Sequence, residues 1–239
     1  MNTTEKDPVR FRQQAEAVCS TYAQAIDRSQ SGEHTVSLDE MTGIQALERT
    51  APTKPARPGL IERREFEYIR HGTQTLIANF DVSSGQVLCP SLGDSRTEVD
   101  FVAHIAQTVA TDPAAHWTFV LDQLNIHQSE GLVLWVAQHC RLTDALGQKG
   151  KTGILATMVS RAAFLADPTH RIRFVYTAKH SSWFNQIELW FSILMRRLLK
   201  RASFVSIADL NQRILDFIAF FNRTAKPFKW TYTGRPLCA

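Results

Sequence analysis

The chain has 239 residues, of which 44% are hydrophobic and 21% are charged, a composition typical of a soluble globular protein with one large domain. No apolar run approaches the roughly 18 residues of a membrane-spanning helix, and the N-terminus lacks the apolar core of a signal peptide. The four cysteines form no C-x-x-C pair, which argues against a zinc site or a disulfide framework and favours a cytoplasmic protein.

The positive charge is concentrated in the second half of the chain. Residues 1–139 contain 11 Lys or Arg and 18 Asp or Glu, whereas residues 140–239 contain 16 and 5. Because each cation that meets a phosphate releases condensed counterions, this excess favours a polyanionic partner. A basic solvated surface without a partner is the alternative.

The first half of the chain predicts one helix followed by strands. A helix is expected over residues 8–28, whose apolar residues recur at helical spacing, and a linker is expected over 29–34. The apolar run 35–38 predicts a buried strand that ends at Asp39. Further elements are expected at 40–49 (a turn and a short strand), 50–60 (a loop), 65–70 and 73–80 (two strands joined by a hairpin turn at His71-Gly72) and 86–89 (a strand).

The second half alternates helices with strands. Helices are expected at 96–109, 129–139, 155–165, 183–198 and 207–221, and strands at 117–121 and 172–176. Residues 141–171 begin as a basic loop and form an insertion before the last strand. This order predicts an α/β protein with a mixed sheet that carries helices on both faces.

Three carboxylates occupy positions where a charge is costly. Asp39 and Asp122 each end a strand that the sequence predicts to be buried, and Glu188 lies within the predicted helix 183–198. A carboxylate at such a place needs a partner or a cation. The alternatives are that each Asp only forms a turn and that Glu188 lies on a solvated helix flank. Gathered together, the three acids suit a divalent metal and phosphodiester chemistry.

Several short segments together resemble a known family. They are Leu-Asp-Gln-Leu-Asn-Ile-His at 121–127, Tyr-Thr-Ala-Lys-His-Ser-Ser-Trp-Phe-Asn-Gln-Ile-Glu at 176–188, Leu-Asp-Glu at 38–40, Thr-Gly-Ile-Gln-Ala-Leu-Glu-Arg at 42–49 and Phe-Phe-Asn-Arg at 220–223. In this order they resemble the DDE-type transposases of bacterial insertion sequences, in the branch related to mariner elements. The resemblance covers nearly all of the chain from about residue 34 onward.

The resemblance implies a ribonuclease H-like fold over 34–239, preceded by an N-terminal helix and linker at 1–33. It implies that Asp39, Asp122 and Glu188 bind metal and are catalytic, with Asp39 bridging two ions of Mg²⁺ or Mn²⁺. The expected reaction is cleavage of DNA at element ends, followed by strand transfer into target DNA. Three features depart from the family: Gln123 in place of Asn, Ala178 in place of Pro, and the long separation of the second and third acids, which accommodates 141–171.

Other residues of these segments are candidates for contact with DNA. His127 either contacts phosphate or orders its loop. The residues before the Glu188 helix lie where backbone N–H groups favour phosphate, unless Ser181 or Ser182 only caps that helix. Asn185 either orients Glu188 or reaches DNA. The candidate DNA-binding residues are His127, Lys179, His180, Ser182, Asn185, Arg196, Arg197, Lys200 and Arg201.

The stretch before the first strand is shorter than relatives of this kind have. They carry N-terminal helix-turn-helix modules, but the roughly 34 residues here suffice for one helix. The sequence therefore predicts the catalytic half of a transposase, associated with the nucleoid. Its candidate partners are element-end and target DNA, a second copy in a synaptic dimer, and a separately encoded helix-turn-helix half. Two alternatives stay open: an inactive or repurposed DNA-binding remnant, and a non-transposing ribonuclease H-like nuclease.

Overall fold

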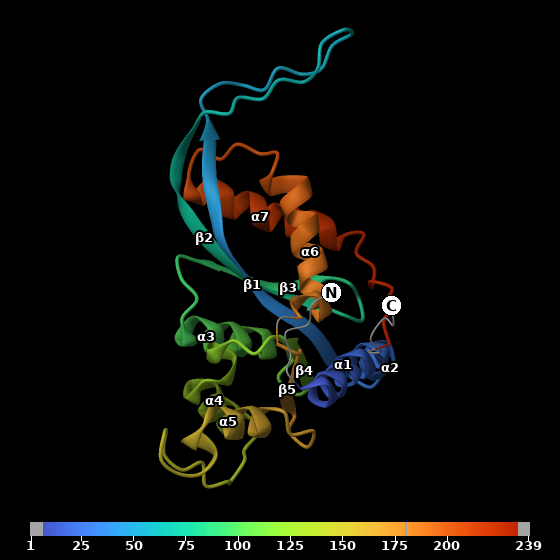
Figure 1. The fold of residues 1–239 in the computed structure, drawn as a ribbon, viewed down its shortest axis with the longest axis vertical. Coiled ribbons are helices and arrows are strands. Elements are labelled where there is room, and N and C mark those ends of the chain that lie inside the picture. The colour runs from blue at the N-terminus through green and yellow to red at the C-terminus, as the bar shows by residue number, and fades with distance from the viewer. Residues whose placement is uncertain (1–6, 180, 234–239) are drawn as a thin grey trace.

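The computed structural model describes residues 7–179 and 181–233, and a five-stranded sheet organises them. The strands are β1 (Glu33–Arg49), β2 (Tyr68–Asp81), β3 (Val87–Gly93), β4 (His116–Leu121) and β5 (Ile172–Tyr176). Their order in the sheet is β3-β2-β1-β4-β5 (Figure 1). β1, β2 and β3 are antiparallel neighbours, whereas β4 and β5 run parallel to β1.

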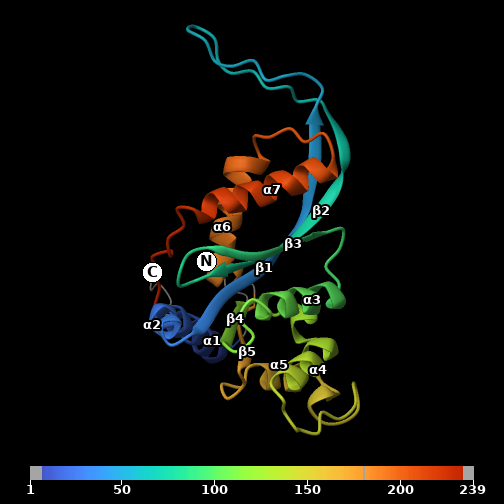
Figure 2. The same ribbon diagram turned by 180° about the vertical axis from the view of Figure 1, so that it is seen from behind.

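Helices cover both faces of this sheet, which confirms the predicted α/β class. On one face, α3 (Glu98–Val109), α4 (Glu130–His139) and α5 (Met158–Leu165) pack on side chains such as Val36 and Phe119. On the other face, α6 (Gln186–Leu194) and α7 (Ile207–Asn222) pack on side chains of β1 and β2 (Figures 1 and 2). The two cores alternate along each strand, because successive side chains point to opposite faces.

The central hairpin differs from the prediction. Two short strands were expected before the loop and two after it. In the structure each pair forms one continuous strand, β1 or β2. Residues 50–67 project beyond the body as a narrow arm (Figures 1 and 2). The predicted hairpin turn at His71-Gly72 is wrong, because both residues lie inside β2. Gly72 has φ +131° at a register shift, where a bulge uses the backbone freedom of glycine without ending the strand.

The N-terminal segment is part of the folded body. It forms two helices, α1 (Pro8–Ala23) and α2 (Ala25–Gln30), so the link to β1 is shorter than the predicted 29–34. Asp7 caps α1 by accepting from the N–H groups of Val9 and Arg10. Apolar residues of α1 pack with Val120 and Phe184 in a third core cluster.

The last described residues of the chain pack against α1 and β2. Residues 224–233 form no helix or strand, yet the Trp230 ring lies 5.1 Å from Tyr22 of α1, and Phe228 stacks on Phe80 of β2 at 4.6 Å.

The basic segment 141–171 is likewise anchored, because apolar residues along it pack into the core under α4 and α5. None of the helices in the described ranges is both long and apolar enough to span a membrane.

Candidate active site

The three predicted acids come from three elements that meet at the middle of the sheet. Asp39 lies inside β1, Asp122 directly follows β4, and Glu188 lies in the first turn of α6. β1 and β4 are parallel neighbours whose last registered pair is Ser37 with Val120, so Asp39 and Asp122 lie two residues further along adjacent strands. The prediction that a strand ends at Asp39 is wrong, since β1 continues to Arg49.

Asp39 is a buried carboxylate surrounded by other acids. It is 8% exposed, and burial raises its pKa to about 7. The backbone N–H of Glu40 lowers this pKa, while the charges of Asp122, Glu40 and Glu188 raise it further. Burial and the charge of Asp122 also raise the pKa of Glu188. Besides burial, the neighbouring acids therefore disfavour the ionisation of Asp39 and of Glu188.

Asn185, which directly precedes α6, holds Asp39 in place. Its amide nitrogen donates to the Leu38 carbonyl at 2.7 Å and to Asp39 Oδ2 at 3.2 Å, and its oxygen accepts from Ser37 Oγ. The side chain has no exposed surface. The side-chain hydrogen bonds of Asn185 thus run to β1, whereas the roles predicted for it, orienting Glu188 or contacting DNA, stay predictions.

The start of α6 is tied to the body by side chains of other elements. Ser37 Oγ accepts from the Ile187 N–H at 2.9 Å, and the Tyr22 hydroxyl accepts from the Gln186 N–H at 3.4 Å. No side chain of the preceding serines caps the helix, because Asn185 is the N-cap residue and makes no capping bond. These first amides are therefore not available to a phosphate.

Asp122 is fixed by its own loop and by a buried histidine. Oδ1 accepts from the Leu124 N–H at 2.9 Å and lies 2.8 Å from His127 Nδ1. Burial raises the pKa of Asp122, but the hydrogen bond and charge of His127 outweigh this and hold it below its usual value. Conversely, although burial lowers the pKa of His127, Asp122 and Glu40 raise it to about 9.

His127 has no exposed surface, which favours the predicted ordering role in the loop over the predicted contact with phosphate. Gln123, a departure from the family pattern, donates from Nε2 to the Thr177 carbonyl at 2.8 Å and so joins the ends of β4 and β5. No local pattern marks Glu40, Ser37 or Tyr22, because their contacts join positions far apart in the chain.

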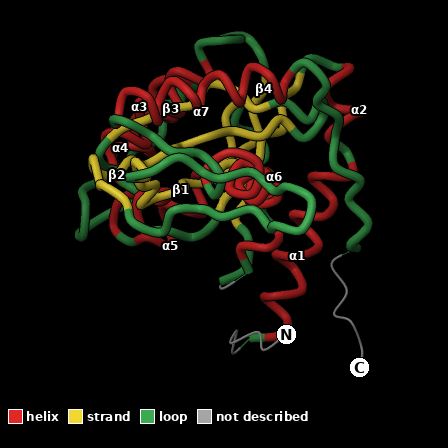
Figure 3. Tube along the Cα trace, turned by 90° about the horizontal axis from the view of Figure 1, so that it is seen from above, coloured by secondary structure: helices red, strands yellow, loops and turns green. Residues whose placement is uncertain are grey.

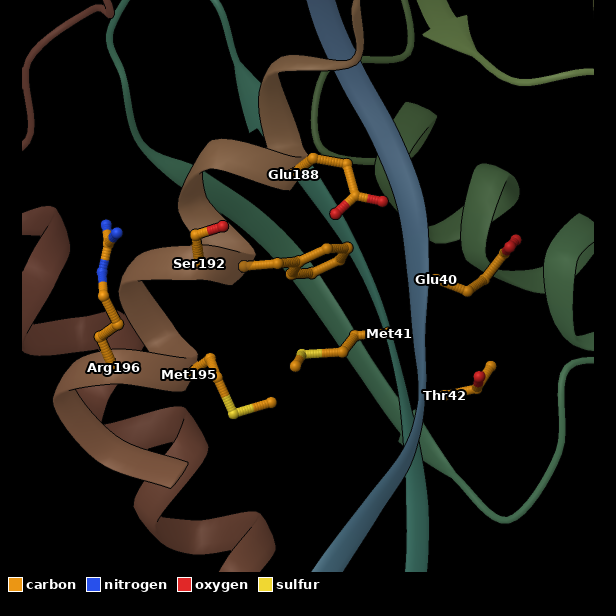
Figure 4. A pocket seen from close by; sticks show the side chains of 8 residues that line it. Glu40, Met41, Thr42, Glu188, Ser192, Met195 and Arg196 are labelled. Atoms are coloured by element: carbon orange, nitrogen blue, oxygen red, sulfur yellow. The ribbon is translucent and has the colours of Figure 1, made fainter. Parts of the chain in front are cut away.

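An open cleft of about 470 Å³ separates β1 from α6 beside the acids. Figure 4 shows Glu188 directed from α6 towards β1, with Arg196 further along the same helical segment. Seen from above, α6 lies end-on beside β1 (Figure 3). The lining residues are Glu40, Met41, Thr42, Glu188, Phe191, Ser192, Met195 and Arg196. A carboxylate and a guanidinium along one open cleft suit a charged, extended ligand.

The donor atoms fit a hard divalent cation, although the side chains do not close around one point. Carboxylate oxygens are the ligands that Mg²⁺ prefers, and a cation would relieve the repulsion that raises the pKa of Asp39. In the part of the chain that the structure describes, no three His, Cys, Asp or Glu side chains converge into a ready-made metal site. Glu188 is only partly buried and points towards β1, which carries Asp39 (Figure 4).

The remaining candidate DNA contacts lie on the surface. Lys179 and Ser182 are exposed just before α6. Four cations follow α6, where the helix widens into a π-helix at Met195–Leu199, and all four are exposed: Arg196, Arg197, Lys200 and Arg201. His180 lies outside the described residues.

Comparison with known proteins gives matches in sequence pattern and in fold. The pattern of the family described as DDE superfamily endonuclease matches residues 34–211. A comparison with curated proteins finds no matching sequence. The sheet and helices superpose on the catalytic domain of Mos1 mariner transposase with a TM-score of 0.50 and 10% identity, covering 92% of this chain and 85% of that one. The sheet order and these helices thus form a ribonuclease H-like fold.

Two larger structures match over most of this chain. They are a pre-cleavage Mos1 transpososome (TM-score 0.52, 13% identity, 87% of this chain and 56% of that one) and a Mos1 transposase paired-end complex with left transposon end (TM-score 0.53, 12% identity, 92% and 57%). The chain spans little more than half the length of these two proteins.

Proposed function

Because this chain belongs to the DDE superfamily endonucleases, we propose that it is the catalytic part of a transposase, which cleaves DNA at element ends and joins the freed ends to target DNA. The observation that supports the proposal is that Asp39, Asp122 and Glu188 come from three neighbouring elements, β1, the end of β4 and the start of α6, and that Glu188 lines an open cleft. The similarity in fold to transposase structures bound to transposon ends supports DNA as the substrate.

The three acids are the proposed metal ligands and catalytic residues. Asp39, held by Asn185 and the Glu40 N–H, would bridge two Mg²⁺ or Mn²⁺ ions, and Asp122 and Glu188 would each hold one. Two such ions supply an activated attacking oxygen and stabilisation of the leaving oxygen. A structure of the Mos1 transposase catalytic domain has been solved with Mn, which supports a divalent metal.

Exposed cations next to the cleft are the proposed DNA contacts. Arg196 lines the cleft, and Arg197, Lys200 and Arg201 continue the positive charge along the end of the helix. Lys179 and Ser182 lie at the other end of α6 and extend the proposed DNA-contacting surface to that end. Cations in this arrangement follow the phosphate backbone and confer affinity with little sequence preference.

The proposed partners follow from the substrate. Joining two element ends requires both ends in one complex, so we propose a homodimer for synapsis and a separate helix-turn-helix half for reading the ends. We propose that the protein acts on DNA in the bacterial cytoplasm.

The experiment is nicking of supercoiled plasmid DNA in Mn²⁺ or Mg²⁺, followed by a joining assay with pre-cleaved ends. Wild-type protein is expected to nick and to join, whereas Asp39→Asn, Asp122→Asn and Glu188→Gln should each lose at least about 100-fold in rate, as expected when a metal ligand is removed. Asp216→Asn, an exposed acid of α7, is the matched control and should keep full activity.

Three results would contradict the proposal. Full nicking by Asp122→Asn would remove the assigned metal site. Folded wild-type protein without nicking in either metal would identify an inactive remnant, and nicking without joining would identify a hydrolytic nuclease.

A further inference from the structure

Glu40 follows Asp39 in the chain but lies on the opposite side of β1. Neighbouring strand residues point to opposite faces, so Asp39 faces α6 while Glu40 faces the core under α3. Figure 4 shows Glu188 and Glu40 on the two sides of the β1 ribbon. The Glu40 side chain has no exposed surface, and a buried carboxylate is costly unless it has a partner.

The partner of Glu40 is His127. Glu40 Oε1 lies 2.9 Å from His127 Nε2, and the other ring nitrogen, Nδ1, lies 2.8 Å from Asp122 Oδ1. Nδ1 also donates to the backbone carbonyl of Asp122 at 3.2 Å, so this ring nitrogen contacts both the side chain and the main chain of Asp122. Glu40 is also 3.6 Å from Arg96 Nη1, across a gap too long for a hydrogen bond. The His127 ring thus connects Glu40 of β1 with Asp122, the second predicted metal ligand.

The ring itself is held on its remaining sides. The Phe101 ring of α3 packs against it with centroids 4.5 Å apart. The Tyr176 hydroxyl donates to the backbone carbonyl of His127 at 2.9 Å. With both nitrogens engaged and one face covered, the imidazole has one orientation, and that orientation fixes the position of Asp122.

The contacts of Asp122 are divided unequally between its two oxygens. Oδ1 accepts from the Leu124 N–H and forms an ion pair with His127 Nδ1 at 2.8 Å, whereas the side chain as a whole is 41% exposed. We propose that Glu40 and His127 are positioning residues, which hold Asp122 by Oδ1 so that Oδ2 faces a divalent cation. This inference rests on the proposed function, because it assigns Asp122 as a metal ligand.

The expected size of the effect follows from the chemistry of metal sites. Residues that orient a ligand through hydrogen bonds typically change metal affinity by about 10- to 100-fold when they are replaced. A residue that only fills the core changes the stability of the fold, and leaves the affinity of the folded protein unaltered. Metal affinity therefore separates the two roles without recourse to enzymatic activity.

The test is Mn²⁺ binding to the folded protein, measured by electron paramagnetic resonance of free Mn²⁺, with circular dichroism as the measure of folding. His127→Phe and Glu40→Leu keep the approximate volume and remove the hydrogen bonds, so each should weaken Mn²⁺ binding by about 10- to 100-fold. His127→Asn is the conservative variant, because its amide nitrogen replaces Nδ1 as the donor to Asp122. It should retain most of the affinity.

His104→Phe is the matched control. His104 is 1% exposed, lies in α3 and bonds to Asn79 and Ser91, which are not predicted ligands. It should lower stability and leave Mn²⁺ affinity unchanged. Glu40→Gln keeps an acceptor oxygen and should fall between wild type and Glu40→Leu.

The outcomes distinguish this inference from the function on which it rests. If Asp122→Asn weakens Mn²⁺ binding while folded His127→Phe and Glu40→Leu bind like wild type, the positioning role is overturned and the metal site stands. If Asp122→Asn itself binds Mn²⁺ like wild type, the proposed metal site and the positioning role are both overturned. Equal losses in His104→Phe and His127→Phe would also overturn the positioning role.

Discussion

Asp39 and His127 bind protons more strongly in the folded chain than in the unfolded one. The pKa of Asp39 is raised from 3.8 to about 7, so between these values its contribution to stability falls as pH rises. The pKa of His127 is raised from 6.5 to about 9, so its contribution is complete below pH 6.5 and is lost towards pH 9. Both groups thus destabilise the metal-free protein as the solution becomes alkaline.

We therefore expect the melting temperature in EDTA to fall between pH 6 and pH 9, as followed by circular dichroism. Mn²⁺ should restore much of the loss, because a cation takes the place of the proton among the acids. His127→Gln should flatten the part of the curve above pH 6.5, where His127 itself titrates. A melting temperature that is constant or rises from pH 6 to pH 9 would contradict this account.

At the scale of single elements, the π-helix that follows α6 has a predictable effect on DNA binding. If the four exposed cations of this π-helix and of the two residues after it follow the phosphate backbone, replacing Arg196, Arg197, Lys200 and Arg201 by Gln should reduce the slope of log affinity against log salt by about 3 to 4, since each phosphate contact contributes about 0.9. Fluorescence anisotropy with a labelled duplex at several salt concentrations measures this slope.

Arg10→Gln with Arg12→Gln is the control for this series, because both side chains are exposed on α1. The double variant should keep the wild-type slope. An unchanged slope in the fourfold variant would assign the DNA path to another surface.

The elements also show which parts of the fold the sequence could predict. The short strands β4 and β5 were predicted to within one residue, because each reads as a short, mostly apolar run. The long strands β1 and β2 were predicted as broken. Gly43 and Gly72 have φ values of +67° and +131°, and positive φ serves a bulge as well as a turn. Whether such a glycine forms a bulge or a turn depends on how β1 and β2 pair, and that pairing joins residues far apart in the sequence.

The same limit applies to the candidate site. The elements that carry the three acids followed from apolar periodicity and from short motifs. The contacts of Glu40 with His127 and of Asn185 with Asp39 join residues far apart in the chain, and no local pattern marks them. The motif Leu-Asp-Glu at 38–40 contained Glu40, but its burial on the other face depends on the whole sheet.

At the scale of the whole molecule, the last described residues help to hold the site together. Trp230 packs on Tyr22, whose hydroxyl donates to the Phe184 carbonyl at 3.0 Å just before α6. Trp230→Ala should therefore lower the free energy of unfolding by about 1–3 kcal/mol, as loss of a half-buried aromatic contact does. Urea denaturation measures this loss. Phe220→Ala is the control, since that side chain is 63% exposed and should cost little.

The three acids are supplied by β1, by the end of β4 and by α6, in that order along the chain. During synthesis the last of them leaves the ribosome only after the sheet strands have been made, and it reaches the others only when α6 docks on β1. A nascent or misfolded copy therefore lacks the complete set of ligands. On the proposed function, the metal site is complete only once α6 has docked on β1.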